Sequence, residues 1–282
     1  MKATATARTP VDRSERVFLD WLVHGTATEP RVVVVAAHPD DETIGAGGRL
    51  DRLRNARFVY LTDGSPRDPA DAKRAGYDSR ESYAAARHNE LCAALKTAGA
   101  DPLRIRSLNS IDQEACFNLL SLTSDVVELL RSSVADFILT HPYEGGHPDH
   151  DAAAFVVHAA SRSLRRAGER VPVIIETTSY HGIDGNFESG VFLPATTAES
   201  AIAVLSERER DLKVRLFACY RTQTPVLEAF AIDIEQFRVA PQYDFTQPPH
   251  AGRVYYETRN WGVSGEQWRA LARGALAELE MA

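Results

Sequence analysis

Two short segments of the chain carry most of the residues that could do chemistry. The first, His38-Pro39-Asp40-Asp41-Glu42, places a histidine and a proline before three consecutive acids. The second runs from His141 to His150, holds three of the nine histidines, and ends in His147-Pro148-Asp149-His150. Neutral imidazoles and carboxylates are ligands of divalent transition metals. Because each segment contains a His-Pro-Asp tripeptide, coincidence is a poor explanation, and the pattern predicts one metal site built from both.

Three of these side chains make a suitable ligand set. His38, Asp41 and His150 supply two imidazoles and one carboxylate, a combination that suits Zn²⁺. Three protein ligands leave a fourth position open for water, as hydrolytic zinc sites do. A lone histidine is more often structural, and we expect that role for the histidines outside the two segments. These are His24, His88, His158, His181 and His250.

Both segments follow an apolar run that reads as a buried strand. The run Val32–Ala37 ends at His38, which the following proline restricts to an extended conformation. The run Asp136–Thr140 comes directly before His141. In a doubly wound sheet, two such strands can be neighbours where the strand order reverses, and ligands bind at their carboxyl ends. We therefore expect both segments to face one crevice.

The rest of the chain predicts the fold that holds this crevice. Apolar strands alternate with amphipathic helices, which is typical of an α/β, doubly wound, mostly parallel Rossmann-like sheet with helices on both faces. The expected strands are 32–37, 57–62, 105–108, 136–140 and 171–175, and the expected helices are 81–97, 117–134 and 149–165. We predict a single domain with an N-terminal extension (1–30), a core carrying the metal site (31–180) and an irregular C-terminal elaboration (181–282).

Several local features are predicted with it. A disordered start should lead into a short helix at 17–23, and a helix should follow Glu42 through Ile44, Leu50 and Leu53. The polar, proline-containing stretch 65–81 reads as a loop that could form a lip over the substrate. Later in the chain we expect a long helix near 198–220, a strand at 230–234 and a C-terminal helix from about Gly265.

Composition excludes several classes of protein. The 282 residues are 44% hydrophobic and 25% charged, as in an ordinary globular protein. A net charge of −7 argues against nucleic acid as a partner, because binding phosphates needs a basic face. No apolar run is long enough for a membrane span, and the N-terminus lacks the apolar region of a secretory signal. Three scattered cysteines, Cys92, Cys116 and Cys219, are typical of free thiols in a cytoplasmic protein.

The two His-Pro-Asp segments together resemble the paired motifs of the LmbE/PIG-L family. These proteins are zinc-dependent de-N-acetylases of N-acetylglucosamine-type sugars and their conjugates. The similarity also covers Leu61–Gly64 and Arg87 with Glu90. It extends more weakly to Lys213 followed by 220–223, so the resemblance spans about residues 31–225. It implies an enzyme that hydrolyses an amide by means of a zinc-activated water, acting on a small amino-sugar substrate.

The resemblance also implies a role for each residue of the two motifs. His38, Asp41 and His150 would hold zinc, and Asp40 would be the general base. His147 would face the oxyanion, with Asp149 orienting it. Arg87, and Glu144 just before the two glycines that precede His147, are the expected substrate contacts.

Other readings compete with this one. A metallo-phosphoesterase or metallo-β-lactamase-like hydrolase would use H-x-H-x-D-H, but Gly145 stands where the first histidine should be. A nucleotide-binding protein without hydrolytic activity would need a glycine-rich turn after the first strand, where this chain has acids. A non-catalytic sugar-binding relative would be expected to lack Asp40 or His147. The sequence leaves open the conjugate, the pathway, the bound divalent metal and whether the chain forms a homo-oligomer.

Overall fold

A seven-stranded sheet forms the centre of the molecule. The computed structural model describes residues 13–25, 30–194 and 200–281, and its sheet has the strand order β3-β2-β1-β4-β5-β9-β8. Strands β1 to β5 are parallel, whereas β9 and β8 are antiparallel. Their bounds are β1 Val32–Ala36, β2 Arg57–Pro66, β3 Ile105–Asp112, β4 Phe137–Thr140, β5 Val173–Thr177, β8 Ser200–Val204 and β9 Ile234–Val239. A separate hairpin pairs β6 (Tyr180–Ile183) with β7 (Asn186–Ser189). The predicted α/β class and the mostly parallel sheet are confirmed.

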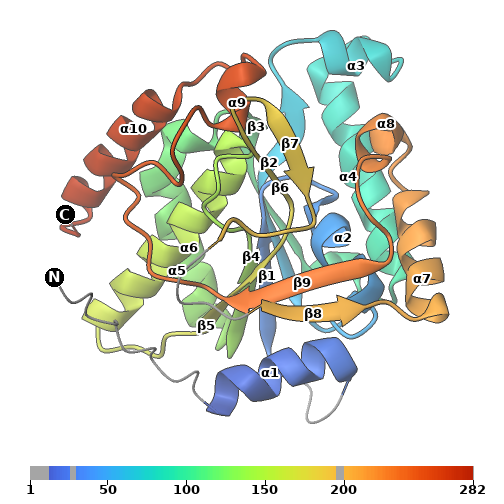
Figure 1. Ribbon diagram of the computed structural model, residues 1–282, viewed down its shortest axis with the longest axis horizontal. Coiled ribbons are helices and arrows are strands. Elements are labelled where there is room, and N and C mark those ends of the chain that lie inside the picture. Colours follow the sequence, from blue (N-terminus) through green and yellow to red (C-terminus); the bar gives the residue numbers. More distant parts are fainter. Residues whose placement is uncertain (1–12, 26–29, 195–199, 282) are drawn as a thin grey trace, which may run out of the picture.

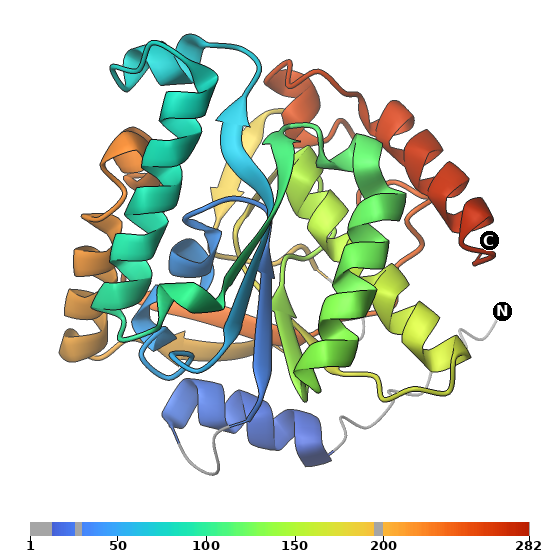
Figure 2. The same cartoon turned by 180° about the vertical axis from the view of Figure 1, so that it is seen from behind.

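Helices cover both faces of the sheet (Figures 1 and 2). Along β1, Val33 and Val35 point into one hydrophobic core, and Val32 and Val34 point into the other. The first core is closed by α5 (Leu119–Ser133), α6 (Pro148–Arg166) and α10 (Gly265–Glu278). The second is closed by α1 (Arg13–His24), α2 (Asp41–Ala46), α4 (Arg80–Thr97) and α7 (Glu207–Phe217). The valine run of β1 is therefore apolar throughout because both of its faces are buried.

The reversal of strand order lies where the sequence predicted it. Strand β1 pairs in parallel with β2 on one side and with β4 on the other, in the register Val33↔Ile138. The carboxyl ends of β1 and β4 thus meet at one edge, and the segments that follow them leave the sheet side by side. The expected helices at 81–97, 117–134 and 149–165 are present as α4, α5 and α6. Helix α1 includes the predicted 17–23, and the predicted disordered start lies outside the described residues.

Four predictions in the first half of the chain differ from the structure. The helix expected to run through Leu53 ends at Ala46, and a 3-10 turn at Gly47–Arg49 follows. Gly48 approaches the segment before α7 so closely that a Cβ there would lie 2.7 Å from Leu205 Cδ1. Strand β2 does not end at Thr62 but continues, with two register shifts, to pair Pro66 with Asp112 of a longer β3. Within 65–81, the expected loop contains the short helix α3 (Ala70–Arg74).

The long helix predicted at 198–220 is also wrong. Residues 200–204 form strand β8, and helix α7 starts after a capping box between Ser206 and Glu209. The segment alternates with period two, since Ala203 is 1% exposed and Val204 is 72% exposed. The strand expected at 230–234 instead begins at Ile234, the first residue of β9. Short elements that the sequence did not predict are α8 (Thr224–Leu227), α9 (Tyr255–Thr258) and the 3-10 turns at 102–104, 115–118 and 221–223.

Over the described ranges, none of the helices combines the length and the apolar character that crossing a bilayer requires. All three cysteines are free thiols.

One buried histidine gives the fold a pH dependence that can be measured. His158 on α6 is 8% exposed and packs against Tyr243 and Phe245, and burial lowers its pKa to about 4. The unfolded chain takes up a proton at this residue below about pH 6.5, but the folded protein does not until about pH 4, so stability falls as the pH drops through this window.

We expect the His158→Leu variant to lack this component of the pH dependence. Between pH 7 and pH 4.5 the free energy of unfolding of the wild type should fall by about 2–3 kcal/mol more than that of the variant. Denaturant titrations of both proteins at the two pH values measure the difference. Equal losses would show that His158 takes up its proton equally well in the folded state.

Candidate functional site

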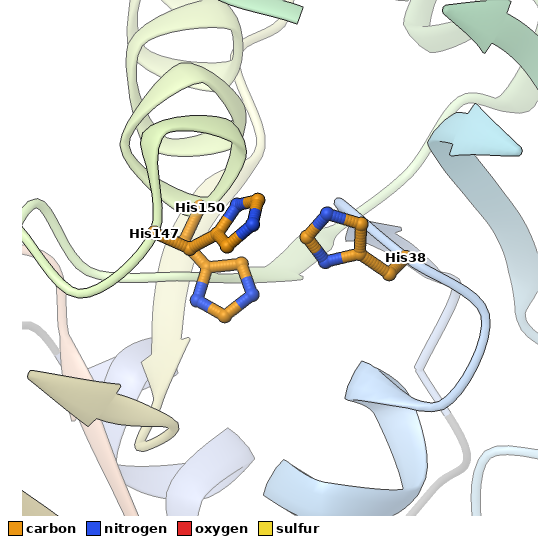
Figure 3. A group of neighbouring side chains, drawn as sticks. All are labelled: His38, His147 and His150. Carbon is orange, nitrogen blue, oxygen red and sulfur yellow. The ribbon is translucent and has the colours of Figure 1, made fainter. Parts of the chain in front are cut away.

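The two histidine-containing segments converge at the carboxyl edge of the parallel strands. His38 follows β1, and the segment from His141 to His150 runs from the end of β4 into the first turn of α6. The ring centroids of His38 and His147 are 4.5 Å apart, and those of His38 and His150 are 5.2 Å apart. Figure 3 shows His38 on one side of this cluster and His147 and His150 on the other, at the start of α6. The arrangement brings together residues that are more than 100 positions apart in the sequence.

Asp40 sits in a strained backbone conformation between His38 and α2. Its backbone φ is 128°, a value that residues other than glycine rarely adopt and that costs about 1–3 kcal/mol of conformational free energy. Its carbonyl accepts hydrogen bonds from the N–H groups of Thr43 and Ile44, which holds the turn in place. The strained turn separates the side chains of Asp40 and Asp41, so that each has its own set of partners.

Glu42, the third acid, is a structural residue. Its carboxylate accepts hydrogen bonds from Thr43 Oγ1, the Tyr60 and Tyr220 hydroxyls and the Asp40 N–H. All of these donors are buried, and Glu42 is 2% exposed. The carboxylate therefore ties the turn after β1 to β2 and to the segment after α7.

A buried ion pair fixes the other end of α2. Lys213 of α7 donates to the carbonyl of Ile44 at 2.9 Å and to Glu235 at 3.0 Å. Glu235 of β9 in turn accepts from the Gly48 N–H at 2.8 Å. Lys213 and Tyr220, which the sequence analysis connected only weakly with the site, thus support the backbone that carries the acids.

Asp41 joins the predicted ligands. Its Oδ1 lies 3.2 Å from His150 Nε2, and its Oδ2 lies 3.4 Å from His38 Nδ1. Burial raises the pKa of Asp41, but His150 and His141 outweigh it and hold this pKa well below its ordinary value. Asp41 is therefore ionised, with one oxygen toward each of the other two predicted ligands.

Several overlapping sets of side chains have the spacing of metal ligands. Within each set the ligand atoms lie within 4.8 Å of one another. The sets are His38–His147–His150, Asp41–His141–His150, and His38–Asp112–His147–Asp149. His141 belongs to one of them: its Nε2 lies 3.2 Å from Asp41 Oδ2, and its ring stacks on His150 at 4.1 Å.

The charges of the cluster fit a divalent cation. Asp40, Asp41, Asp112 and Asp149 all face it, with side chains at most 13% exposed, while Arg87 is the permanent cation beside Asp40. Burial lowers the pKa of His150 to about 4, and the ring is therefore neutral, as a metal ligand must be. Burial lowers the pKa of His38 too, but the carboxylates of Asp112, Asp149 and Asp41 outweigh it and hold this pKa well above its ordinary value. A bound cation would take the place of that proton among the carboxylates.

Sequence reasoning missed Asp112. This residue ends β3, and its Oδ1 lies 3.1 Å from His38 Nε2 and 3.8 Å from His147 Nε2. The reason is that β3 is longer than the sequence predicts. A strand ending at 108 leaves Asp112 in a loop, whereas the observed β3 carries it to the same edge as His38.

His147 is held in one tautomer by its neighbour. The Asp149 N–H donates to His147 Nδ1 at 3.2 Å, which leaves Nε2 as the protonated nitrogen of the neutral ring. Burial and nearby His38 hold the pKa of His147 well below its ordinary value. The Asp149 carboxylate is 3.9 Å from His147 Nδ1; it accepts from the Gln113 and Ala115 N–H groups and lies 3.2 Å from His38 Nε2.

Arg87 and Glu144, the expected substrate contacts, are both buried in networks of the protein itself. Arg87 donates to the carbonyls of Gly64 and Pro39 and lies 3.1 Å from Asp40 Oδ2. Glu144 accepts from the Leu193 N–H at 2.8 Å and from Arg238 at 3.2 Å. Direct contact of either side chain with a substrate stays a prediction, whereas the observed contacts position Asp40 and the loop before His147.

Comparison with known proteins identifies the segment that carries this cluster. The profile of the PIG-L family, described as GlcNAc-PI de-N-acetylase, matches residues 33–161. A Bacillus cereus protein named as a probable N-acetyl-alpha-D-glucosaminyl L-malate deacetylase is 32% identical over 152 residues, which cover 52% of this chain and 66% of that protein. A 1D-myo-inositol 2-acetamido-2-deoxy-alpha-D-glucopyranoside deacetylase from Mycobacterium sp. is 31% identical over 165 residues, 51% of this chain and 53% of that protein. The chain thus spans less than two thirds of the length of either relative.

Solved structures share the fold. A deacetylase of an antimicrobial pseudoaglycone superposes with a TM-score of 0.56 at 18% identity, over 77% of this chain and 99% of that one. The N,N'-diacetylchitobiose deacetylase of Pyrococcus horikoshii superposes with a TM-score of 0.51 at 21% identity, over 78% and 84%. The matched segment begins at β1 and ends within α6, and so contains both histidine segments. Residues 33–161 of this chain thus form a PIG-L (LmbE) family domain.

Proposed function

We propose that this protein is a metal-dependent hydrolase that removes the acetyl group from an N-acetylated amino sugar of the N-acetylglucosamine type or from its conjugate. The observation that carries the proposal is the pairing of a buried His/Asp cluster with a separate carboxylate, Asp40, that is held by Arg87. The names of the two relatives, both deacetylases of N-acetylglucosamine-type compounds, support it.

The proposed ligands of the metal are His38, Asp41 and His150, and the proposed metal is Zn²⁺. The support is the position of Asp41, with one oxygen toward each histidine, and the neutral state of His150. A divalent ion bound there would supply Lewis acidity, which polarises an amide carbonyl and lowers the pKa of a water molecule.

The remaining side chains transfer the proton and stabilise the developing charge. Asp40 is the proposed general base: it accepts the proton of the attacking water while Arg87 holds its carboxylate in place. His147 presents its Nε2–H to the developing oxyanion, because the Asp149 N–H occupies Nδ1. The nitrogen of the amino sugar leaves as an amine with the proton that Asp40 took from the water, while His147 stays neutral.

The cluster also bears on the metallo-phosphoesterase alternative. A two-metal site of that class needs ions about 3.5–4 Å apart, each with its own ligands. Among the described residues, two of the candidate sets share no residue: Asp41–His141–His150 and His38–Asp112–His147–Asp149. The proposed ligands draw on both sets, since His38 belongs to one and Asp41 and His150 to the other, so a single ion held by these three takes ligands from each. The number of bound ions therefore distinguishes the two classes of enzyme.

Removal of the metal is the first test. Treatment with a chelator should abolish amine release from N-acetylglucosamine derivatives, and added Zn²⁺ should restore it, since the side chains described in the site do not replace a Lewis acid. Elemental analysis of the purified protein should find one divalent ion per chain. Full turnover by metal-free protein, or two ions per chain, would contradict the proposal.

A cytoplasmic location is part of the proposal. It rests on the three cysteines, which are free although Cys92 and Cys219 are both partly exposed. Free thiols persist in reducing compartments.

A further inference from the structure

Aromatic rings from the C-terminal part of the chain form a belt around His147 and His150. Trp261 packs on His147 with 4.6 Å between ring centroids, and Tyr180 packs on His150 at 5.2 Å. Tyr255 lies between these two rings, 5.9 Å from Tyr180 and 6.1 Å from Trp261. Since His147 and His150 are themselves 5.2 Å apart, the five rings close a circle.

Two phenylalanines extend the belt away from the histidines. Phe187 of β7 lies 5.5 Å from Tyr180 and 5.6 Å from Tyr255, and Phe230 lies 6.0 Å from Tyr180. Phe187 is opposite Gly182 in the hairpin register, and a Cβ at Gly182 would come within 2.7 Å of Tyr255 Cδ2. The glycine thus lets Tyr255 pack against the hairpin and keeps the rings continuous. In Figure 1 the hairpin β6–β7 lies close to α9, the helix that carries Tyr255.

The belt is buried at the histidines and open at its outer end. Tyr255 is 7% exposed and Phe230 is 8% exposed, whereas Phe187 is 40% exposed and Trp261 is partly exposed. An apolar surface therefore leads from the two histidines to solvent. Phe187 is thus the exposed end of a continuous series of aromatic contacts that starts at His150 and passes through Tyr180.

The chemistry of amino sugars indicates what would occupy this surface. In an N-acetylglucosamine conjugate, the aglycone is attached to the ring carbon next to the one that bears the acetamide. When the acetamide is at the metal cluster, the aglycone must therefore lie within a few ångströms of His147 and His150, where the belt begins.

We propose that the belt is the aglycone subsite and that it takes an apolar group, an aryl or alkyl substituent on the amino sugar. This inference rests on the proposed function. Phe187 and Phe230 cannot form hydrogen bonds to an acid or a polyol, and the faces of Tyr180, Tyr255 and Trp261 favour flat or apolar groups. One cation, Arg259, lies at the rim with its guanidinium 5.2 Å from the Tyr255 ring centroid. The whole belt except the two histidines lies outside residues 33–161, in the part of the chain that the family profile does not match.

Binding can be measured without turnover. In the metal-loaded Asp40→Asn protein, the phenyl glycoside of N-acetylglucosamine should bind about tenfold more tightly than the methyl glycoside of the same anomer. Tryptophan fluorescence reports it, because Trp21 is 6% exposed and Trp268 is 0% exposed, which leaves Trp261 as the accessible tryptophan. The Phe187→Ser change should remove most of the tenfold preference. Leu103→Ser, at a residue that is 92% exposed and distant in the fold, is the matched control and should keep it.

The same glycosides separate the two proposals kinetically. A preference for binding the phenyl glycoside that Phe187→Ser abolishes would support the subsite. This holds even if the wild-type enzyme releases acetate from neither glycoside, because that lack of turnover would overturn only the proposed function. Acetate release from both glycosides at equal kcat/KM with equal Kd would overturn the subsite and leave the function standing. Tighter binding of a malate conjugate of N-acetylglucosamine than of the phenyl glycoside would also overturn the apolar subsite. Such a result would indicate that Arg259, rather than the aromatic rings, sets the specificity.

Discussion

Replacement of Asp40 by asparagine is expected to lower kcat by about 10²–10⁴ while the protein keeps its metal. The amide has nearly the size of the carboxylate but cannot accept the proton of the attacking water. The fold should survive, because asparagine is among the residues that best tolerate a positive φ and Asp40 has a φ of 128°. The side-chain oxygen of the introduced asparagine can still accept a hydrogen bond from Arg87, which donates to Asp40 at 3.1 Å in the wild type.

The adjacent aspartate provides the contrast. Asp41→Ala should lose the metal itself, because it removes the carboxylate that lies between His38 and His150. Measuring metal content and kcat of the two variants in parallel tests the assignment. An Asp40→Asn enzyme that turns over at nearly the wild-type rate would contradict it, as would an Asp41→Ala protein with stoichiometric, tightly bound metal.

The dependence of kcat/KM on pH is a second test of Asp40 as the general base. Burial raises the pKa of Asp40, and Arg87 opposes this effect only in part. A base is active when ionised, so kcat/KM of the wild type should fall as the pH drops through a pKa above the usual range of an aspartate. This limb should disappear or move in the residual activity of Asp40→Asn. An unchanged limb would assign it to another group.

The parts of this site that the sequence predicts are those set by local pattern. The valine run of β1 identifies a strand buried on both faces, and His38-Pro39 marks its end. Pro148 marks the start of the helix expected at 149–165, and α6 begins at that residue. A doubly wound sheet allows β1 and β4 to be neighbours at the switch point, and the structure pairs them there.

The parts it does not predict depend on contacts between distant segments. The sequence predicts helix where β8 lies, because Ile202, Leu205, Leu212 and Leu216 have helical spacing and alanine favours helix. The pairing of β8 with β9 overrides this local preference. Asp112 reaches the site only because β3 continues alongside the lengthened β2. The φ of Asp40 and the support of α2 by Lys213 and Glu235 are likewise products of packing between segments far apart in the sequence.

The His147→Ala variant is expected to lower kcat by about 10²–10⁴ with the metal retained. In the wild type the Asp149 N–H donates to Nδ1 of His147, so the ring carries its proton on Nε2. Alanine lacks this N–H donor, and the hydrogen bond to the oxyanion is lost. His147→Gln, whose amide can donate a hydrogen bond but cannot transfer a proton, should recover part of the loss if oxyanion stabilisation dominates. Metal content again decides between roles, because His147 also belongs to a set with His38 and His150 that has ligand spacing. Loss of the metal from His147→Ala would make His147 a ligand, and the proposed roles of His147 and His150 would then have to be exchanged.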